Sequence, residues 1–306
     1  MRAVTIREFG GPDVLEIGEV PVPLPGPLQV RIRVAAATVN PVDVQTRSGA
    51  LARAGIMPPR EVVGLGWDVS GTVDAVGPAV EDFTPGDRVI GLSDRPGLAL
   101  KAQADQVVLD AAATARLPDG ADLVAAATLP LNALTAAQAL DLLPRPPETL
   151  LVTGAAGAVG GYAVELAARA GARVIAVARP GDGPLVRSLG AAEVVPPSAD
   201  LAADVRALAP GGVDAAVDAA GLGIGALDAV RGAGAFVSVL GGAAPPPLRG
   251  IRVANVWIRA DGPRLATLAA ADLTLRVAAT LPLTHVAEAH RRLETGGLRG
   301  RLVLVP

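Results

Sequence analysis

The feature that most constrains the fold is a glycine-rich run at 150–161, which reads Leu-Leu-Val-Thr-Gly-Ala-Ala-Gly-Ala-Val-Gly-Gly. An apolar strand runs into a glycine turn, and the pattern then predicts a helix that begins near Val159. Glycines in such a turn let backbone N–H groups and the helix start approach a pyrophosphate. A second apolar run, 173–178, follows at the distance that a βαβ crossover requires. The run therefore predicts a dinucleotide-binding unit; the alternative is that the glycines only pack a helix against a sheet.

Composition excludes several other classes of protein. The 306 residues, 51% of them hydrophobic, are enough for about two domains with a core each. The net charge is −3 and the arginines are scattered, so we expect small-molecule partners rather than nucleic acid or a membrane surface. There is no cysteine, which excludes disulfides, thiolate catalysis and zinc sites built on thiolates.

Residues 1–10 resemble a first strand rather than a signal peptide, and no apolar run reaches the roughly 18 residues of a membrane span. A soluble, cytoplasmic protein is the default expectation.

The chain divides into two kinds of pattern. Up to about residue 118, short β-type runs such as 30–34 and 69–76 alternate with glycine and proline turns, which indicates a β-rich, barrel-like domain. A helical pattern at 121–143 is broken by Pro130. Beyond residue 148, strands and helices alternate, which is typical of a doubly wound α/β parallel sheet with helices on both faces. The predicted strands are 149–153, 173–178, 193–195, 213–218, 235–240 and 251–258, followed by 276–280 and 302–305 on either side of a helix at 284–293.

In a doubly wound sheet the ligand lies along the carboxyl ends of the strands. Versions that prefer NAD place an acidic residue after the second strand, where this chain has Arg179. A guanidinium suits the 2′-phosphate of NADP(H), so NADP(H) is the predicted cofactor; an ordinary surface arginine is the alternative. The candidate cofactor-binding residues are Gly154, Ala155, Ala156, Gly157, Ala158, Val159, Gly160, Arg179, Ala219, Gly221, Leu240 and Gly241.

Further motifs run nearly from end to end of the chain. They are Val-Asn-Pro-Val-Asp at 39–43, Gly-Thr-Val-Asp-Ala-Val-Gly at 71–77, Phe-Thr-Pro-Gly-Asp-Arg-Val at 83–89, the glycine loop, and Arg-Gly-Arg-Leu-Val-Leu at 299–304. Together they resemble the zinc-independent quinone oxidoreductase (zeta-crystallin-like) branch of the medium-chain dehydrogenase/reductase superfamily. The resemblance implies a GroES-like β-rich catalytic domain from 1–118 and 265–306, with a Rossmann NADP(H)-binding domain at 119–264 between its two parts.

The resemblance also implies site residues. Asn40 stands where the zinc-dependent alcohol dehydrogenases carry a cysteine, and Gly-Trp-Asp at 66–68 replaces their Gly-His-Glu, so no metal site is expected. Asn40 is the candidate to hydrogen-bond the nicotinamide ribose or a substrate carbonyl, with a loop-capping asparagine as the alternative. Thr135 matches a segment beside the nicotinamide, with an ordinary threonine at the start of a helix as the alternative.

Few side chains offer acid–base chemistry. Relatives often carry a tyrosine after Arg-Ser-Gly, but here Ala50 and Leu51 occupy that stretch, and the only tyrosine, Tyr162, lies near the start of the nucleotide-binding helix. We therefore expect solvent to protonate the product. Other ionisable residues receive structural or surface roles: Asp43 is expected to brace its loop, and Lys101, His285 and His290 are expected at the solvated surface.

The resulting hypothesis is an NADPH-dependent oxidoreductase of the quinone or enoyl reductase type, which sends hydride to a quinone or an α,β-unsaturated carbonyl. Two alternatives stay open: a lyase or cyclase that keeps the fold without hydride transfer, and a nucleotide-binding protein without turnover. The resemblance further implies a homodimer in which 251–258 pairs edge to edge with its copy.

Overall fold

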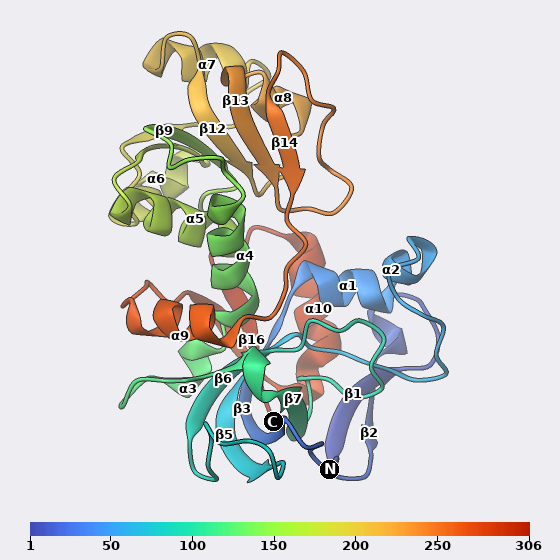
Figure 1. Cartoon of the computed structure of the whole chain (residues 1–306). Coiled ribbons are helices and arrows are strands. Elements are labelled where there is room, and N and C mark those ends of the chain that lie inside the picture. Colours follow the sequence, from blue (N-terminus) through green and yellow to red (C-terminus); the bar gives the residue numbers. More distant parts are fainter. The chain divides into compact units, whose positions relative to one another are not determined.

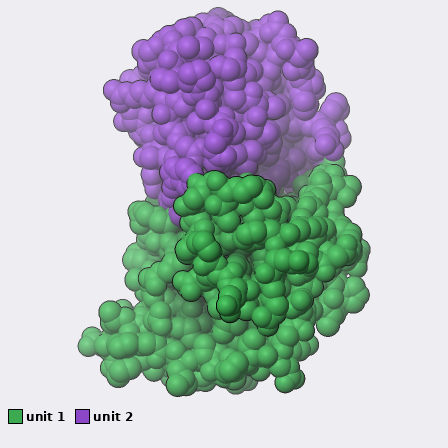
Figure 2. Space-filling model, turned by 90° about the vertical axis from the view of Figure 1, so that its right-hand side faces the viewer, with its two compact units in different colours: residues 1–131, 259–306 green, residues 132–258 purple.

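The computed structural model describes residues 1–306 and divides into two compact units, coloured separately in Figure 2. Unit 1 contains Met1–Leu131 and Arg259–Pro306, and unit 2 contains Asn132–Ile258. Unit 1 is therefore assembled from segments on both sides of unit 2 in the chain. The domain boundaries expected near residues 118 and 264 stay a prediction. None of the helices is both long enough and apolar enough to cross a membrane.

Unit 2 is built on a six-stranded parallel sheet (Figure 1). The strand order is β11-β10-β9-β12-β13-β14, and every neighbouring pair is parallel. The chain leaves β9 in one direction along the sheet and later continues from β12 in the other, which creates a topological switch point between these two strands. The doubly wound fold predicted from the alternating pattern is confirmed. The strands are β9 (Thr149–Thr153), β10 (Arg173–Val177), β11 (Glu193–Val195), β12 (Val213–Asp218), β13 (Val230–Ser238) and β14 (Arg252–Asn255).

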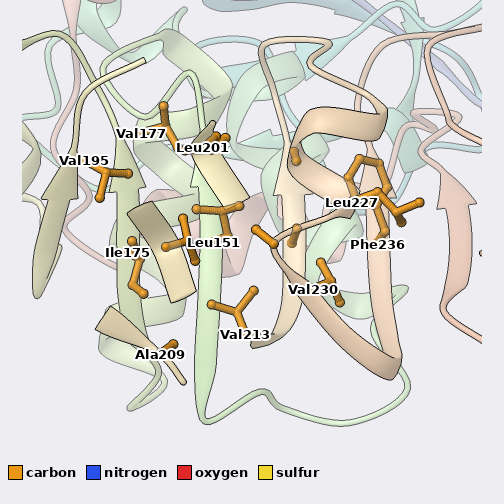
Figure 3. Close-up of a cluster of buried hydrophobic side chains, with 14 of the residues drawn as sticks. Leu151, Ile175, Val177, Val195, Leu201, Ala209, Val213, Leu227, Val230 and Phe236 are labelled. Carbon is orange, nitrogen blue, oxygen red and sulfur yellow. The ribbon is translucent and has the colours of Figure 1, made fainter. Parts of the chain in front are cut away.

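Helices cover both faces of this sheet. α5 (Ala158–Arg169) packs against β9, β10 and β12, whereas α7 (Leu201–Leu208) and α8 (Ile224–Leu227) pack against a buried cluster that includes Leu151 and Phe236 (Figure 3). The crossovers through α5 and α8 run in opposite directions along the sheet. Since such crossovers are right-handed, these two helices lie on opposite faces.

Unit 1 is rich in β-strands, as the sequence predicted. Its larger sheet has the order β15-β16-β3-β5-β6-β8, with β7 also paired to β3, and its smaller sheet has the order β2-β1-β4. β16, from the end of the chain, pairs antiparallel with β3. The strands are β1 (Arg2–Ile6), β2 (Glu16–Glu19), β3 (Gln29–Val39), β4 (Val63–Gly64), β5 (Asp68–Val76), β6 (Arg88–Leu92), β7 (Gln106–Asp110), β8 (Thr114–Arg116), β15 (Val277–Pro282) and β16 (Arg301–Val305).

The core of unit 1 includes two larger buried apolar clusters, one between α10 and the strands β1 and β16, the other among β3, β5 and β7. The chain passes from unit 1 to unit 2 within α4 (Pro130–Asp141). This helix begins at the proline that breaks the helical pattern, because a first helical residue needs no N–H donor. The other helices are α1 (Pro41–Arg47), α2 (Ala50–Arg53), α3 (Leu123–Ala126), α6 (Gly183–Ser188, in unit 2), α9 (Gly262–Ala270) and α10 (Val286–Thr295), with 3-10 turns at Pro12–Val14, Ala111–Ala113, Pro180–Asp182 and Leu283–His285.

Candidate functional site

The loop after β9 is shaped by glycines that leave little room for a side chain. Gly154 has a φ of +59°, in the region that favours glycine, and the N–H of Gly157 donates to its carbonyl at 2.8 Å. A Cβ on Gly160 would collide with the same carbonyl oxygen. Gly157 is the residue that precedes α5, so the loop leads directly to the positive end of this helix's dipole. A glycine-rich turn at a helix N-terminus fits a pyrophosphate.

The other predicted cofactor residues of unit 2 meet this loop along one edge of the sheet. A Cβ on Gly154 would lie 3.2 Å from the carbonyl of Ala219, and one on Gly221 would lie 3.0 Å from Leu240 Cδ1. Ala155 N donates to Val177 O at 3.2 Å, which joins the loop to the end of β10. The edge therefore brings together the carboxyl ends of β9, β10, β12 and β13 at the switch point. Ala156, Ala158 and Val159 belong to the same loop and helix start, and Gly241 follows Leu240 after β13.

Asp218 organises this edge, although no sequence pattern indicated a role for its side chain. Its buried carboxylate accepts hydrogen bonds from Thr153 Oγ1 at 2.5 Å, Leu222 N at 3.1 Å and Gly223 N at 2.9 Å. These bonds fold the 219–223 loop back onto β12. An acidic residue that ends a buried strand, directly before Ala-Ala-Gly, is the signal that could have identified it.

Arg179 lies where the second strand of the sheet gives way to the turn before α6. Its side chain is exposed, and its carbonyl accepts the N–H of the buried Asp182 at 2.9 Å. The turn thus fixes the backbone while the guanidinium extends into solvent. Arg187, on α6, is a second exposed arginine nearby in the chain.

In unit 1, Asn40 joins β3 to α1 and its side chain is fully buried. Its amide Nδ2 donates to Thr38 Oγ1 at 2.8 Å and to Asp68 Oδ2 at 2.6 Å. Its backbone N–H donates to Asp43 Oδ2 at 2.8 Å, and Asp43 Oδ1 accepts the N–H of Gly66 at 2.8 Å. Asp43 therefore braces its loop, as predicted. Asn40 is also the N-cap of α1 and forms a capping box with Asp43, so the loop-capping alternative describes its place in the fold.

Asp68 was seen in the sequence only as part of a departure from Gly-His-Glu. It is fully buried at the start of β5, and its Oδ2 also accepts the hydroxyl of Thr38. Its Oδ1 accepts the N–H of Leu131, in the first turn of α4. Burial raises the pKa of Asp68, while these donors act against the shift. Asp68 thereby ties together β3, the residue before α1 and the start of α4.

The surface position expected for Lys101 is wrong. The side chain is buried, and its ammonium donates to the carbonyl oxygens of Ser93 at 2.9 Å and Arg95 at 3.2 Å. It lies over the Trp67 ring, 3.9 Å from the ring centre. Burial lowers the pKa of Lys101 to about 7, and burial raises the pKa of nearby Asp43 to about 6. A cation that keeps carbonyl acceptors and an aromatic face can be buried, which a lone lysine in a sequence does not reveal.

The same correction applies to His290, but not to His285, which is exposed as expected. His290 is fully buried on α10, with Nδ1 3.4 Å from Nη1 of Arg47. Arg47 is itself buried and pairs with Glu294 at 2.5 Å. Burial, together with the Arg47 cation, lowers the pKa of His290 to about 3. The ring is therefore neutral at physiological pH.

Thr135 lies well inside α4 and is buried. It is the sixth residue of the helix, so its interpretation as a threonine at a helix start is wrong. The structure places it in unit 2, whereas Asn40 belongs to unit 1.

Comparison with known proteins agrees with this architecture. Residues 26–119 match the alcohol dehydrogenase GroES-like domain family, and residues 189–304 match the zinc-binding dehydrogenase family. A solved structure described as an NAD-dependent alcohol dehydrogenase is 34% identical, with a TM-score of 0.84 and full coverage of both chains. The quinone oxidoreductase of Rattus norvegicus is 37% identical over 198 residues. The chain belongs to the medium-chain dehydrogenase/reductase superfamily, which includes the alcohol dehydrogenases.

The rat match covers 63% of this chain and 58% of the rat enzyme. Among solved members of the superfamily, a mycobacterial protein complexed with NADPH is 29% identical, with a TM-score of 0.84 and full coverage of both chains.

One of the matching families is named for zinc binding. The side chains at the corresponding positions of this chain are not suited to bind a zinc ion. The chain has no cysteine, and Asn40 presents its amide nitrogen to Asp68. Trp67, which stands where the zinc enzymes carry histidine, offers no lone pair and holds the Lys101 ammonium over its ring. The structure contains no group of three or more His, Cys, Asp or Glu side chains that could hold a metal ion.

Proposed function

We propose that this chain is a zinc-independent, NADPH-dependent oxidoreductase that transfers hydride to a quinone or an α,β-unsaturated carbonyl compound. The proposal depends on one observation. Gly154 lies close to the backbone of Ala219, at the switch point of the sheet and beside the N-terminus of α5. The exposed Arg179 after the second strand supports NADPH over NADH. The NADPH complex of the mycobacterial relative supports the same choice.

The residues have separate tasks in this scheme. The 154–160 loop and the start of α5 bind the pyrophosphate, and Arg179 pairs with the 2′-phosphate. NADPH, when bound, supplies a hydride from its nicotinamide ring. Thr135 and Asn40 are proposed to contact the nicotinamide half or the acceptor. Reduction of a quinone to its hydroquinone takes one hydride and one further proton at the second oxygen, and solvent supplies that proton. Positioning of the two reactants then provides most of the rate enhancement.

Fluorescence titration with NADPH and NADH tests the cofactor assignment. Wild type should bind NADPH at least tenfold more tightly than NADH, and Arg179→Ala should abolish that preference, a loss of about 1.4 kcal/mol or more. Arg187→Ala removes another exposed arginine and serves as the matched control. Consumption of NADPH with a panel of quinones and enones then tests the reaction. Nucleotide binding without turnover on the whole panel would favour the non-enzymatic alternative, and absence of binding would overturn the proposal. The homodimer and the cytoplasmic location stay predictions.

A further inference from the structure

We propose that Asp94 anchors the second chain connection between the two units to unit 1, and that the buried Lys101 is the positioning residue that holds Asp94 in place. The span Trp257–Arg259 is then the hinge about which unit 2 moves. The first connection is α4, and the second follows Ile258, the last residue of unit 2. The inference goes beyond the proposed function, because it concerns the link between the units and not the nucleotide site.

The hinge span lies between two hydrogen bonds that belong to different units. On the side of unit 2, the N–H of Val256 donates to Ser238 O at 2.9 Å, which holds the chain to the end of β13. On the side of unit 1, the N–H of Ala260 donates to Asp94 Oδ2 at 2.7 Å. Between these two points lies Trp257–Arg259, whose first and last side chains are exposed. A short span between fixed ends is where a hinge can absorb changes in φ and ψ.

Beyond Ala260 the chain is fixed to unit 1. The side chain of Asp261 caps α9. Gly262 lies so close to the start of β8 that a Cβ on it would be 2.5 Å from Thr114 O. Asp94 therefore holds the chain at the point where its fixed part begins.

Asp94 follows the same end of the β5–β6 pair that anchors the first connection. Asp68 lies opposite Leu92 in this antiparallel pair, two residues before Asp94. The Asp68 carboxylate accepts the N–H of Leu131, the last residue of unit 1 before the chain enters unit 2. Neighbouring strands are only about 4.8 Å apart, so both connections begin from nearly one place. Two links that start so close together favour rotation of unit 2 about that place over translation.

Lys101 holds the turn that carries Asp94. Its Nζ donates to Ser93 O at 2.9 Å and to Arg95 O at 3.2 Å, the carbonyl oxygens on either side of Asp94. The same ammonium lies over the ring of Trp67, in the segment that leads into β5, and the N–H of Ser93 donates to Trp67 O at 2.7 Å. A buried cation that the hydride-transfer scheme does not use thus fixes the direction of the Asp94 side chain.

Hydrogen exchange at the Ala260 amide tests the anchor without turnover. Asp94→Ala removes the acceptor and should speed this exchange by about tenfold or more, whereas Asp94→Asn keeps a side-chain oxygen and should stay near wild type. Lys101→Met should speed it severalfold although Asp94 is unchanged. Asp87→Ala is the control, because it removes a similar bond from Thr84 N, at 2.8 Å, elsewhere in unit 1.

The exchange rates can overturn each part of the inference separately. Wild-type exchange at Ala260 in Asp94→Ala would overturn the anchor. Wild-type exchange in Lys101→Met would overturn the positioning role of the lysine. Equal acceleration in Asp87→Ala would show that the amide reports global stability, and would overturn the local role of Asp94.

Limited proteolysis is a second test, because trypsin cleaves after arginine and the bond between Arg259 and Ala260 lies at the hinge. Cleavage there should be faster in Asp94→Ala than in wild type, since it follows the population of the locally opened chain. Cleavage after Arg53, another exposed arginine of unit 1, should be the same in both proteins. Equal acceleration at the two sites would contradict a local effect.

Turnover gives a third readout, which rests on the proposed function. Asp94→Ala should lower kcat severalfold and leave the NADPH dissociation constant unchanged, because the nucleotide loop belongs to unit 2 and is not altered. Asp94→Asn should restore kcat. A wild-type kcat in Asp94→Ala with accelerated exchange at Ala260 would overturn the hinge. Accelerated exchange in a protein that reduces no acceptor would leave the anchor in place and count against the reductase proposal.

Discussion

The ammonium of Lys101 lies 3.9 Å from the centre of the Trp67 ring, inside unit 1. This ring contact and the hydrogen bonds to the carbonyl oxygens of Ser93 and Arg95 together account for the burial of the lysine. The burial of Lys101 also leads to a stability that rises with pH above neutral, because burial lowers the pKa of the ammonium.

Lys101→Met should remove a rise in stability above neutral pH. Burial lowers the pKa of Lys101 to about 7 from its ordinary 10.5. Between these values the unfolded chain holds a proton that the folded protein has released, so wild-type stability gained from this group increases with pH. The free energy of unfolding of wild type relative to that of Lys101→Met should therefore increase by up to about 1.4 kcal/mol for each pH unit between these two pKa values. Urea unfolding at pH 7, 8, 9 and 10 measures it, and parallel curves for the two proteins would contradict the shift.

His290→Gln should alter acid stability. The pKa of His290 is about 3 in the fold against an ordinary 6.5, so the unfolded state takes up a proton that the folded state excludes. The stability contributed by this neutral ring is complete above about pH 6.5 and is lost as the pH falls toward 3. Chemical unfolding from pH 8 to pH 4 should show the wild-type advantage over His290→Gln shrinking. His285→Gln, at an exposed histidine, is the control and should follow wild type.

Asp218→Ala should weaken nucleotide binding. Loss of the carboxylate leaves the N–H groups of Leu222 and Gly223 without their acceptor and loosens the 219–223 loop. We expect the NADPH dissociation constant to rise five- to tenfold, which corresponds to about 1 to 1.4 kcal/mol.

The control for Asp218 lies at the other end of the same strand. Asp214 accepts from Glu148 N at 3.0 Å and Thr149 N at 2.9 Å, at the amino ends of β9 and β12. Asp214→Ala should lower the thermal midpoint as well, but leave NADPH affinity near that of wild type. Equal losses of affinity in both variants would show that Asp218 acts only through global stability.

Gly160→Ala should abolish nucleotide binding. The added methyl group collides with the carbonyl of Gly154, which is backbone and cannot move aside cheaply. The loop must then open or α5 must shift, and either change misplaces the N–H groups aimed at the pyrophosphate. Gly181→Ala is the control, because a Cβ at Gly181 meets no atom within 4 Å. Titration with NADPH compares the two, and tight binding by Gly160→Ala would show that the loop accommodates a side chain.

Local patterns predicted the fold well because they depend on residues close in sequence. Four strands of unit 2, β9 to β12, and the glycine loop were located almost to the residue, and the helix at 284–293 was found as α10, Val286–Thr295. The strand predicted at 235–240 begins earlier, as β13, Val230–Ser238. The strand expected at 251–258 is shorter, Arg252–Asn255, because it lies at the edge of the sheet with one neighbour.

The polar residues of the core were harder to predict because their partners lie far away in the chain. Lys101 depends on Trp67, and His290 faces Arg47 from the other end of the sequence. Asp68 draws its donors from three separate elements. Hydrophobic periodicity carries no information on such pairs, so each was interpreted from its residue type alone.

The pairing of β16 with β3 determines the order in which the two units can fold during synthesis. All strands of unit 2 lie between Thr149 and Asn255, so its sheet can close as soon as that stretch has left the ribosome. The larger sheet of unit 1 must wait for β15 and β16, while β3 stays without its outer neighbour. Exposed strand edges of that kind invite pairing with other chains. Translation stalled before residue 277 should therefore yield a nascent chain with a folded nucleotide-binding unit and an aggregation-prone leading segment.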